Sequence, residues 1–307
     1  MAQRWMKGWI DLGLVRDFAI EKTEAYRLCT KPAGWVERYG SDVLVSYKTE
    51  AARDAILPEL EDWAAGSNQR FERVFGRFLP KQNAERHPPR LLSGDPQASL
   101  QTTVLERDVC YSLDFSAGYS SGLFIDQREN RQFVRQSAPR RLLNCFAYTC
   151  SFSVVAGLSG GETLSIDLSK KSLNRGRTNF MVNGLLTDQH RFVADDVVAV
   201  LPRLARRGEK FDMIILDPPT FSRSRTGRGW QVERDFENLL LAALEVAHRE
   251  ARILLSTNCA RLDVRALEVM ARFCLKATRR AASFVRSPQL PDFPPGKGAS
   301  SVWMLLR

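Results

Sequence analysis

From residue 140 onward, short apolar runs alternate with stretches whose apolar residues recur at helical spacing. Near-continuous apolar runs are typical of buried parallel strands, and the amphipathic stretches between them indicate helices. We predict strands at 141–146, 163–167, 191–195, 211–217, 251–257, 281–286 and 300–306. We predict helices at 150–159, 169–182, 232–249 and 264–276, with a further one ending near Arg207. This alternation indicates an α/β fold with a mostly parallel sheet covered by helices on both faces.

The residues before 140 have a different pattern. Residues 35–48 indicate two short strands joined by a Gly-Ser-Asp turn, and residues 50–63 indicate a helix interrupted near Pro58. Residues 82–99 are rich in proline and polar residues, which is typical of a linker or a long surface loop. Residues 102–125 indicate a β-hairpin that runs into a helix. An α+β region therefore precedes the α/β domain.

We expect three parts: a substrate-side α+β region (1–100), a hairpin and connector (101–139), and the α/β domain (140–307). The chain has 45 Lys and Arg against 35 Asp and Glu, a net charge of +10. Residues 140–307 alone hold 26 of these bases and 16 of the acids, so the surplus lies there. Such a basic surface favours a polyanionic partner, above all nucleic acid, over a surface that is merely solvated.

Composition narrows the other possibilities. No apolar run approaches the roughly 18 residues of a membrane span, and the first residues lack the features of a secretory signal. We therefore expect a cytoplasmic protein without a membrane partner. The six cysteines form no Cys-x-x-Cys pair and there are three histidines, so the spacing of a metal site is missing. We expect no metal, and cysteines that serve as small buried side chains.

The predicted strands end in polar or acidic residues. Asp167 follows the second strand, where a carboxylate suits the hydroxyls of a ribose, and Asp195 with Asp196 follows the third, where an acid can accept from an adenine amino group. The turn after the first strand opens a helix that can receive a carboxylate. This set fits S-adenosylmethionine, with NAD as the rival, although each acid alone could be a helix N-cap. The first turn lacks Gly-x-Gly-x-x-Gly, which disfavours a pyrophosphate.

The most specific motif follows the fourth strand and reads Asp217-Pro218-Pro219-Thr220-Phe221-Ser222. Two prolines give a rigid backbone without N–H donors, whose carbonyls and Asp217 can accept from the amino group of a base. Phe221 can stack on a base turned out of its helix. A rigid turn without chemistry is the alternative, but the position at a strand end favours a functional site.

Four segments, 121–128, 143–149, 215–222 and 255–258, together resemble the bacterial large-subunit ribosomal RNA methyltransferases. The similarity runs from about residue 25 to residue 307 and is strongest to the guanine-N7 and cytosine-C5 enzymes. It implies a class I methyltransferase fold, which is a Rossmann-like seven-stranded sheet with the last strand antiparallel and a small N-terminal α+β extension. S-adenosylmethionine would be the cofactor and RNA the partner.

The resemblance also implies roles for single residues. Asp126 and Arg128 would close over the cofactor, the loop from Phe146 to Ser151 would hold its methionine part, and Asp217 would face the methyl group. The candidate cofactor-binding residues are Asp126, Arg128, Asn144, Phe146, Ala147, Tyr148, Thr149, Ser151, Asp167, Leu168, Asp195, Asp196 and Asp217. The candidate catalytic residues are Asp217, Pro218, Pro219, Phe221 and Asn258.

The sequence departs from the family where Cys150 and Ser151 stand in place of common glycines, and it shows no RNA-binding module of the kind that the cytosine enzymes carry. Those enzymes place a nucleophilic cysteine where this chain has Thr257, and Cys259 lies two residues later. Methylation of C5 of cytosine needs that thiolate, whereas N7 of guanine carries a free lone pair. We therefore favour guanine N7, with Asn258 orienting the base.

Two alternatives remain: an RNA-binding assembly factor with weak or lost catalysis, and a methyltransferase for a substrate other than RNA. For the RNA enzyme we expect two basic clusters to border the RNA: Arg203, Arg206, Arg207 and Lys210, and then Arg223, Arg225 and Arg228.

Overall fold

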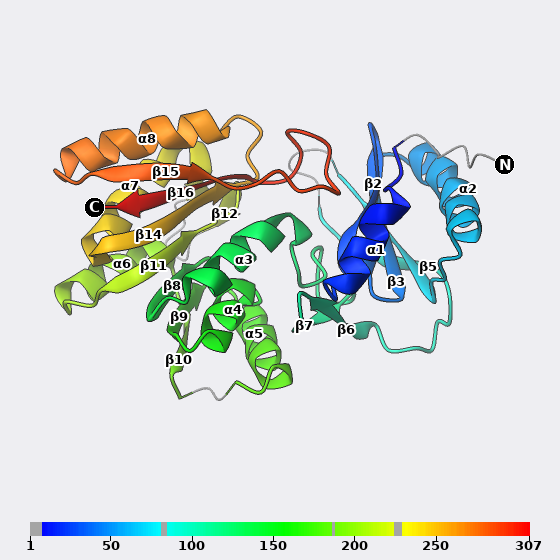
Figure 1. Cartoon of the computed structure of the whole chain (residues 1–307), viewed down its shortest axis with the longest axis horizontal. Coiled ribbons are helices and arrows are strands. Elements are labelled where there is room, and N and C mark those ends of the chain that lie inside the picture. Colours follow the sequence, from blue (N-terminus) through cyan, green and yellow to red (C-terminus); the bar gives the residue numbers. More distant parts are fainter. Residues whose placement is uncertain (1–7, 81–84, 186–187, 224–228) are drawn as a thin grey trace. The chain divides into compact units, whose positions relative to one another are not determined.

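A computed structural model of the chain describes residues 8–80, 85–185, 188–223 and 229–307 (Figure 1). The chain forms two compact units. The first contains Met1–Ile125 and Leu290–Pro295, and the second contains Asp126–Gln289 and Gly296–Arg307. The division at Ile125 falls inside the segment 101–139 that the sequence assigns to a hairpin and connector.

The first unit is built on a five-stranded sheet with the order β1-β2-β3-β4-β5. Its strands are β1 (Ala25–Lys31), β2 (Gly34–Tyr39), β3 (Asp42–Tyr47), β4 (Arg73–Phe78) and β5 (Arg90–Ser93). Helix α1 (Leu12–Ile20) precedes the sheet, and α2 (Glu50–Ser67) links the parallel strands β3 and β4. Strands β6 (Gln101–Glu106) and β7 (Val109–Asp114) form the predicted hairpin.

Two predictions for this unit need correction. Helix α2 runs unbroken through Pro58, because Ile56, Leu60 and Trp63 are buried and offset the hydrogen bond that proline removes. Residues 90–93, predicted as part of a loop, form β5 and pair with β4. A four-residue strand among prolines and polar residues leaves no periodicity to detect.

The second unit contains the predicted seven-stranded sheet, with the order β10-β9-β8-β11-β14-β16-β15. Its strands are β8 (Arg141–Cys145), β9 (Glu162–Asp167), β10 (His190–Ala194), β11 (Phe211–Leu216), β14 (Ala247–Thr257), β15 (Ala282–Arg286) and β16 (Ser300–Leu306). Strand β16, the last in the chain, is antiparallel to both of its neighbours, and β10, β9, β8, β11 and β14 are parallel. The Rossmann-like class I arrangement that the sequence predicts is confirmed.

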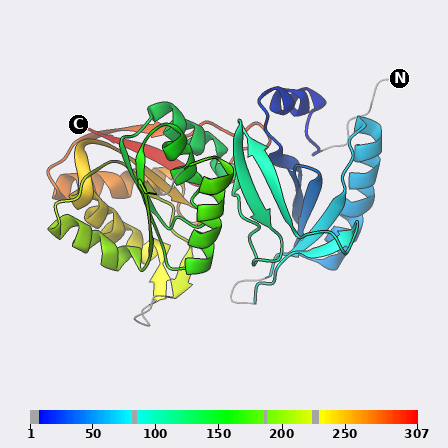
Figure 2. The ribbon, with the colours of Figure 1, turned by 90° about the horizontal axis from the view of Figure 1, so that it is seen from below.

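Helices cover both faces of this sheet (Figures 1 and 2). On one face lie α3 (Arg128–Ser137), which follows the short 3₁₀ turn η1 (Ile125–Gln127), α4 (Ser151–Leu158) and α5 (Lys170–Val182). On the other face lie α6 (Val197–Arg206), α7 (Val232–Val246) and α8 (Val264–Ala277). A short pair of strands, β12 (Phe221–Arg223) and β13 (Gly229–Gln231), precedes α7. None of the described helices has the length and apolar character needed to cross a membrane.

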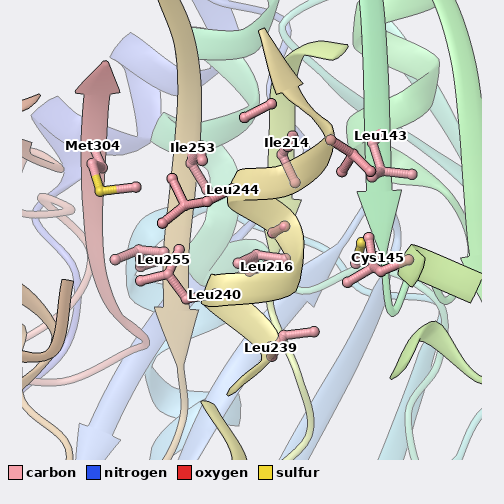
Figure 3. Close-up of a cluster of buried hydrophobic side chains, with 14 of the residues drawn as sticks. Leu143, Cys145, Ile214, Leu216, Leu239, Leu240, Leu244, Ile253, Leu255 and Met304 are labelled. Carbon is pink, nitrogen blue, oxygen red and sulfur yellow. The ribbon is translucent and has the colours of Figure 1, made fainter. Parts of the chain in front are cut away.

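The core between the sheet and α7 follows the two-residue period of the strands (Figure 3). Alternate residues in the central parts of β8, β11 and β14 point toward this helix and are fully buried: Leu143, Cys145, Ile214, Leu216, Ile253 and Leu255. Leu240 and Leu244 of α7 pack against them. Five of the six cysteines are buried, as predicted, and Cys110 is partly exposed. This packing fixes the strand ends from which the site is built.

Candidate active site

The candidate site lies at the edge where the parallel strands β8, β9, β10, β11 and β14 reach their carboxyl ends. The strand order reverses beside β8, because β9 lies on one side of it and β11 on the other. In sheets of this kind, the loops that leave the strands on either side of such a reversal open a crevice for a ligand.

The loop after β8 has an uncommon backbone. Phe146, Tyr148 and Cys150 have positive φ angles of 58°, 48° and 61°, whereas Ala147 and Thr149 between them do not. Each left-handed residue other than glycine costs roughly 1–2 kcal/mol. Three N–H groups of the loop donate within the chain: those of Ala147 and Tyr148 to the carbonyl oxygen of Ile166 and the carboxylate of Asp167, and that of Cys150 to the carbonyl oxygen of Ala147. The loop therefore holds this uncommon backbone without glycine, and two of its hydrogen bonds fix it to β9.

The packing below this loop accommodates Cys150. A Cβ atom at Gly176 of α5 would lie 2.4 Å from the sulfur of Cys150. Burial raises the pKa of the Cys150 thiol to about 12, so this sulfur is a neutral packing group. Glycine at position 176 of α5 thus makes room for the side chain of Cys150.

Asp167 joins the loops after β8 and β9. Its two carboxylate oxygens accept hydrogen bonds from the backbone N–H groups of Tyr148 and Ser169, both at 2.8 Å. Burial raises the pKa of Asp167, and these two hydrogen bonds oppose the rise. Leu168 is partly buried in the same turn. The carboxylate is held in place and keeps acceptor capacity for hydroxyl donors, as a ribose requires.

The acids after β10 have local partners. Asp196 is the N-cap of α6 and accepts from the N–H of Val198 at 3.0 Å, which is the alternative role that its position suggests. Asp195 forms an ion pair with Arg203 of the same helix and accepts from the N–H of Asp196. Arg203 is one of the four residues of the first predicted basic cluster. Its ion pair with Asp195 neutralises part of the positive charge of that cluster.

Asp217 is the centre of a network that connects three strands and α3. Its Oδ2 accepts from Nε2 of Gln127 at 3.2 Å, and the same Nε2 donates to Oγ of Ser256 at 2.8 Å. Asn130 donates to Oε1 of Gln127 at 2.7 Å, and Oδ1 of Asn130 accepts from the indole of Trp303 at 2.9 Å. The position of the Asp217 carboxylate is therefore set by side chains far away in the sequence.

Burial raises the pKa of Asp217 to about 6. The negative charge of Asp126 adds to this rise, whereas a hydrogen bond with Ser256 and the positive charge of Arg131 oppose it. A carboxyl group with this pKa exchanges its proton near neutral pH, and such groups are concentrated at functional sites. Asp126, predicted to lie over the cofactor, is thus close enough to Asp217 to influence its charge.

Trp230 is hydrogen-bonded to the Asp-Pro-Pro turn. The indole N–H of Trp230 donates to the carbonyl oxygen of Pro219 at 3.0 Å, and its ring lies 5.6 Å from that of Phe146. Pro218 is buried, Pro219 is exposed, and the Phe221 side chain is 51% exposed. An aromatic ring that is half exposed beside a rigid turn is available for stacking on a base.

The loop after β14 places Asn258 and Cys259 differently. Asn258 is exposed, whereas Cys259 is buried and its thiol donates to Oε1 of Glu233 at 3.3 Å. The N–H of Cys259 donates to Oγ1 of Thr257 at 3.1 Å. A nucleophilic cysteine typically lies beside a cation or a histidine, whereas the hydrogen-bond partner of this thiol is the carboxylate of Glu233.

The structure brings together the loop 146–151 with Asp167 at the ends of β8 and β9, and Asp126 with Asp217 at the end of β11. Asn144 does not share this edge, since its amide donates to Ser153 at 2.9 Å in the interior. Arg128, the first residue of α3, is 1% exposed. Of the second predicted basic cluster, Arg225 and Arg228 lie outside the described residues, and only the backbone of Arg223 is described, in β12.

Sequence reasoning missed Gln127, Asn130, Ser256 and Trp230. Gln127 lies between two residues that were predicted, and its position next to Asp126 was the one available signal.

Comparison with known proteins gives a family for this arrangement. The family described as S-adenosylmethionine-dependent methyltransferase matches residues 53–303. The chain belongs to the S-adenosylmethionine-dependent methyltransferase family. S-adenosylmethionine is therefore its cofactor, as predicted. The carboxylate of Asp167, held in place at the end of β9, fits this cofactor as an acceptor for ribose hydroxyls.

Curated relatives carry the name ribosomal RNA large subunit methyltransferase I. The relative from Tolumonas auensis is 36% identical over 188 residues, which are 60% of this chain and 47% of that protein. The relative from Aeromonas salmonicida is 34% identical over 63% of this chain and 49% of its own length. The matched region of this methyltransferase thus spans about half the length of these relatives.

Solved structures agree in fold. The crystal structure of SMU.776 in complex with SAH is 25% identical, with a TM-score of 0.82 over 96% of this chain and 79% of that one. A methyltransferase from Agrobacterium tumefaciens has a TM-score of 0.70 at 20% identity, over 92% of this chain and 90% of that one.

Proposed function

We propose that this methyltransferase transfers a methyl group to a base of RNA, with large-subunit ribosomal RNA as the substrate and N7 of guanine as the target. The names of the curated relatives support ribosomal RNA. The surplus of basic residues in 140–307 supports an RNA partner. The observation that carries the proposal is Asp217, a carboxyl group with a pKa of about 6, held by Gln127 beside a rigid, donor-free turn.

The roles of the residues follow from their positions. The loop 146–151 would hold the methionine carboxylate, Asp167 the ribose hydroxyls, and the region of Asp195 the adenine. S-adenosylmethionine supplies an electrophilic methyl group. Asp217 and the carbonyl of Pro218 would accept from the amino group of the target base, and Phe221 would stack on its ring. Asn258, which is exposed after β14, would orient the base from the opposite side.

The choice of guanine N7 over cytosine C5 rests on Cys259. Attack on C6 of cytosine needs a thiolate, and this thiol is buried and donates to Glu233. Guanine N7 needs no covalent step, so placement of the lone pair in line with the methyl group is sufficient. Asp217 and the turn beside it supply that placement.

Two measurements test the proposal. Titration calorimetry with S-adenosylmethionine measures cofactor binding, and transfer of labelled methyl groups to large-subunit ribosomal RNA measures catalysis. Asp217→Asn removes the charge at nearly constant shape and is expected to lower transfer by at least about tenfold, as expected for a group that acts in the transition state. The matched control is Asp263→Asn, which keeps an equally good N-cap on α8 and should not alter transfer.

Three results would count against the proposal. Equal transfer by the wild type and Asp217→Asn would remove Asp217 from the reaction. Cofactor binding without transfer to any RNA would favour a substrate of another class. RNA binding by a chain that binds neither S-adenosylmethionine nor its demethylated product would favour an assembly factor.

A further inference from the structure

A basic depression lies on the second unit at the amino ends of the parallel strands, the edge opposite to the candidate active site. Its volume is about 790 Å³, and it is lined by residues at the starts of β8, β11 and β14 and at the end of β16. Among the described residues that line it, six are Lys or Arg and three are Asp or Glu. The depression therefore carries a positive charge.

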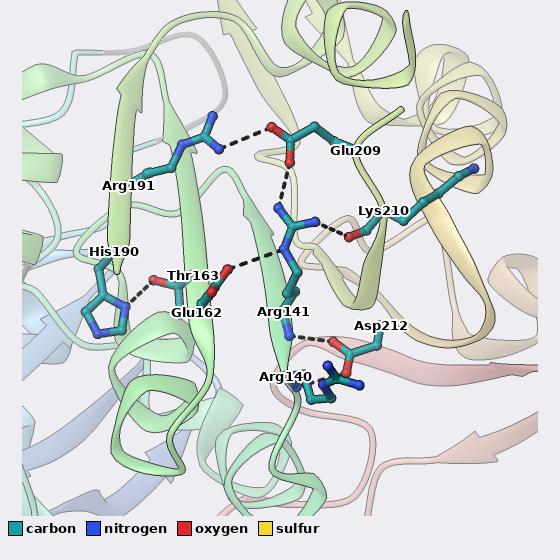
Figure 4. Close-up of polar contacts among 9 residues, drawn as sticks. All are labelled: Arg140, Arg141, Glu162, Thr163, His190, Arg191, Glu209, Lys210 and Asp212. Atoms are coloured by element: carbon teal, nitrogen blue, oxygen red, sulfur yellow. Dashed lines mark hydrogen bonds and ion pairs between the residues drawn. The ribbon is translucent and has the colours of Figure 1, made fainter. Parts of the chain in front are cut away.

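Two of its acids are already engaged (Figure 4). Arg141 pairs with Glu162 at 3.5 Å and with the neighbouring Glu209 at 2.6 Å. Asp212 accepts from the backbone N–H groups of Arg140 and Arg141, both at 2.8 Å. The third acid, Glu250, is exposed and lies beside Arg249 in the sequence.

Three arginines are left to face solvent. Arg140, Arg249 and Arg252 are exposed, and within the described parts of the chain no carboxylate lies at ion-pair distance from them. Arginine presents a planar fork of donors that matches the oxygens of a phosphate group. The three side chains line one depression, so they can contact one polyanion together.

The backbone that carries Arg249 is held in place by Arg280. Phe211 of β11 pairs with Ala247 and Met213 pairs with Arg252, so residues 248–251 form a bulge opposite Asp212. The guanidinium of Arg280 donates to the carbonyl oxygens of four residues at or before this bulge, at 2.9, 3.5, 2.6 and 3.2 Å: Leu244, Ala247, His248 and Arg249. Bulges of this kind re-aim side chains, and here the result is an ordered basic surface.

We propose that this depression binds the phosphate backbone of the RNA at a place remote from the methylated base. The inference rests on the proposed function in one respect, that the polyanion is RNA. Asp212 and Asp217 are five residues apart on β11 and its end, or about 17 Å at the rise of a strand. An RNA that reaches both edges must therefore be folded or extended around the domain, and a short single-stranded fragment occupies the active site alone.

The test compares two triple variants of the full chain. One replaces Arg140, Arg249 and Arg252 by Gln, and the control replaces Arg16, Arg265 and Lys276, which are exposed on α1 and α8, by Gln. Binding to an RNA hairpin is measured at several salt concentrations, with a stem of about 20 base pairs, longer than the roughly 16 that a double-stranded-RNA-binding domain spans. Titration with S-adenosylmethionine checks that each variant is folded.

In the depression variant we expect RNA binding at low salt to weaken at least about tenfold, and the slope of log affinity against log salt to fall by about 2 to 3, since each phosphate contact contributes roughly 0.7–0.9. The control should keep the wild-type slope. An unchanged slope in the depression variant, or an equal fall in the control, would overturn the inference. Weaker binding of inorganic tripolyphosphate with unchanged RNA binding would also overturn it, because the site would then serve a small anion.

The outcomes separate this inference from the proposed function. Methyl transfer to ribosomal RNA with an unchanged salt slope in the depression variant rejects only the basic depression. A slope that depends on the three arginines, in a chain that methylates no RNA, supports the depression and rejects the proposed reaction.

Discussion

Asp217→Asn should stabilise the folded protein while it lowers transfer at least about tenfold. Burial raises the pKa of Asp217 from 3.8 to about 6, which means that folding disfavours the charged form of this side chain. One pKa unit corresponds to about 1.4 kcal/mol, so the charged carboxylate destabilises the fold by up to about 3 kcal/mol above pH 7. Asparagine keeps the shape and an acceptor for Gln127 but carries no charge.

The raised pKa of Asp217 also sets the direction in which stability changes with pH. Between about pH 4 and about pH 6 the folded protein retains a proton on Asp217 that the unfolded chain has released. Stability of the wild type should therefore fall through this window relative to Asp217→Asn, and the difference should level off above it. The variant should gain almost nothing below about pH 3, where Asp217 is neutral in both states.

Thermal unfolding of the cofactor-free protein measures the effect. For a domain of 150–250 residues, 1 kcal/mol shifts Tm by roughly 2–4 °C, so the variant should melt about 6–12 °C higher at pH 8 and nearly together with the wild type at about pH 3. Asp263→Asn, with its cap retained, should show no such divergence. A constant difference between Asp217→Asn and the wild type at all pH values would refute the argument from burial.

Three further substitutions, and a fourth that should rescue the third, have defined outcomes. Asp167→Ala should weaken S-adenosylmethionine binding about 10- to 100-fold by calorimetry, because charge-assisted hydrogen bonds contribute about 1.5–3 kcal/mol; unchanged affinity would contradict the ribose assignment. Cys259→Ser should keep transfer within about twofold, since no thiolate is required, and a complete loss would favour cytosine C5. Gly176→Ala should destabilise the protein by about 1–3 kcal/mol in urea unfolding, because its Cβ would meet Cys150. Cys150→Gly in the same chain should restore most of the loss; no rescue would show that the clash lies elsewhere.

The sequence predicted the parallel sheet well because its strands are apolar on both faces and its helices are amphipathic. It also located Asp167 and Asp217, since the ends of parallel strands meet at one edge regardless of the details of packing. The boundary between α7 and β14 was less well placed. Residues 247–249, predicted as the end of a helix, belong to β14, because the bulge held by Arg280 carries polar residues that interrupt the strand pattern.

Contacts between distant segments could not be predicted. Gln127 is hydrogen-bonded to Asp217 and Ser256, which lie 90 and 129 residues away in the sequence. The spacing of apolar residues carries no information about such pairs. Trp230 meets Pro219 only because β12 and β13 pair. Local chemistry was also ambiguous, as Asp196 shows: an acid before a helix can be a ligand or an N-cap, and the structure places it as the N-cap of α6.

The most direct test of the central claim is nucleoside analysis of large-subunit ribosomal RNA after reaction with the purified protein and labelled S-adenosylmethionine. We expect label in N7-methylguanosine, and at least about tenfold less of it with Asp217→Asn. Label in 5-methylcytidine would contradict the assignment of the target and restore a catalytic role for Cys259. No label in any nucleoside, in a chain that binds the cofactor, would contradict RNA as the substrate.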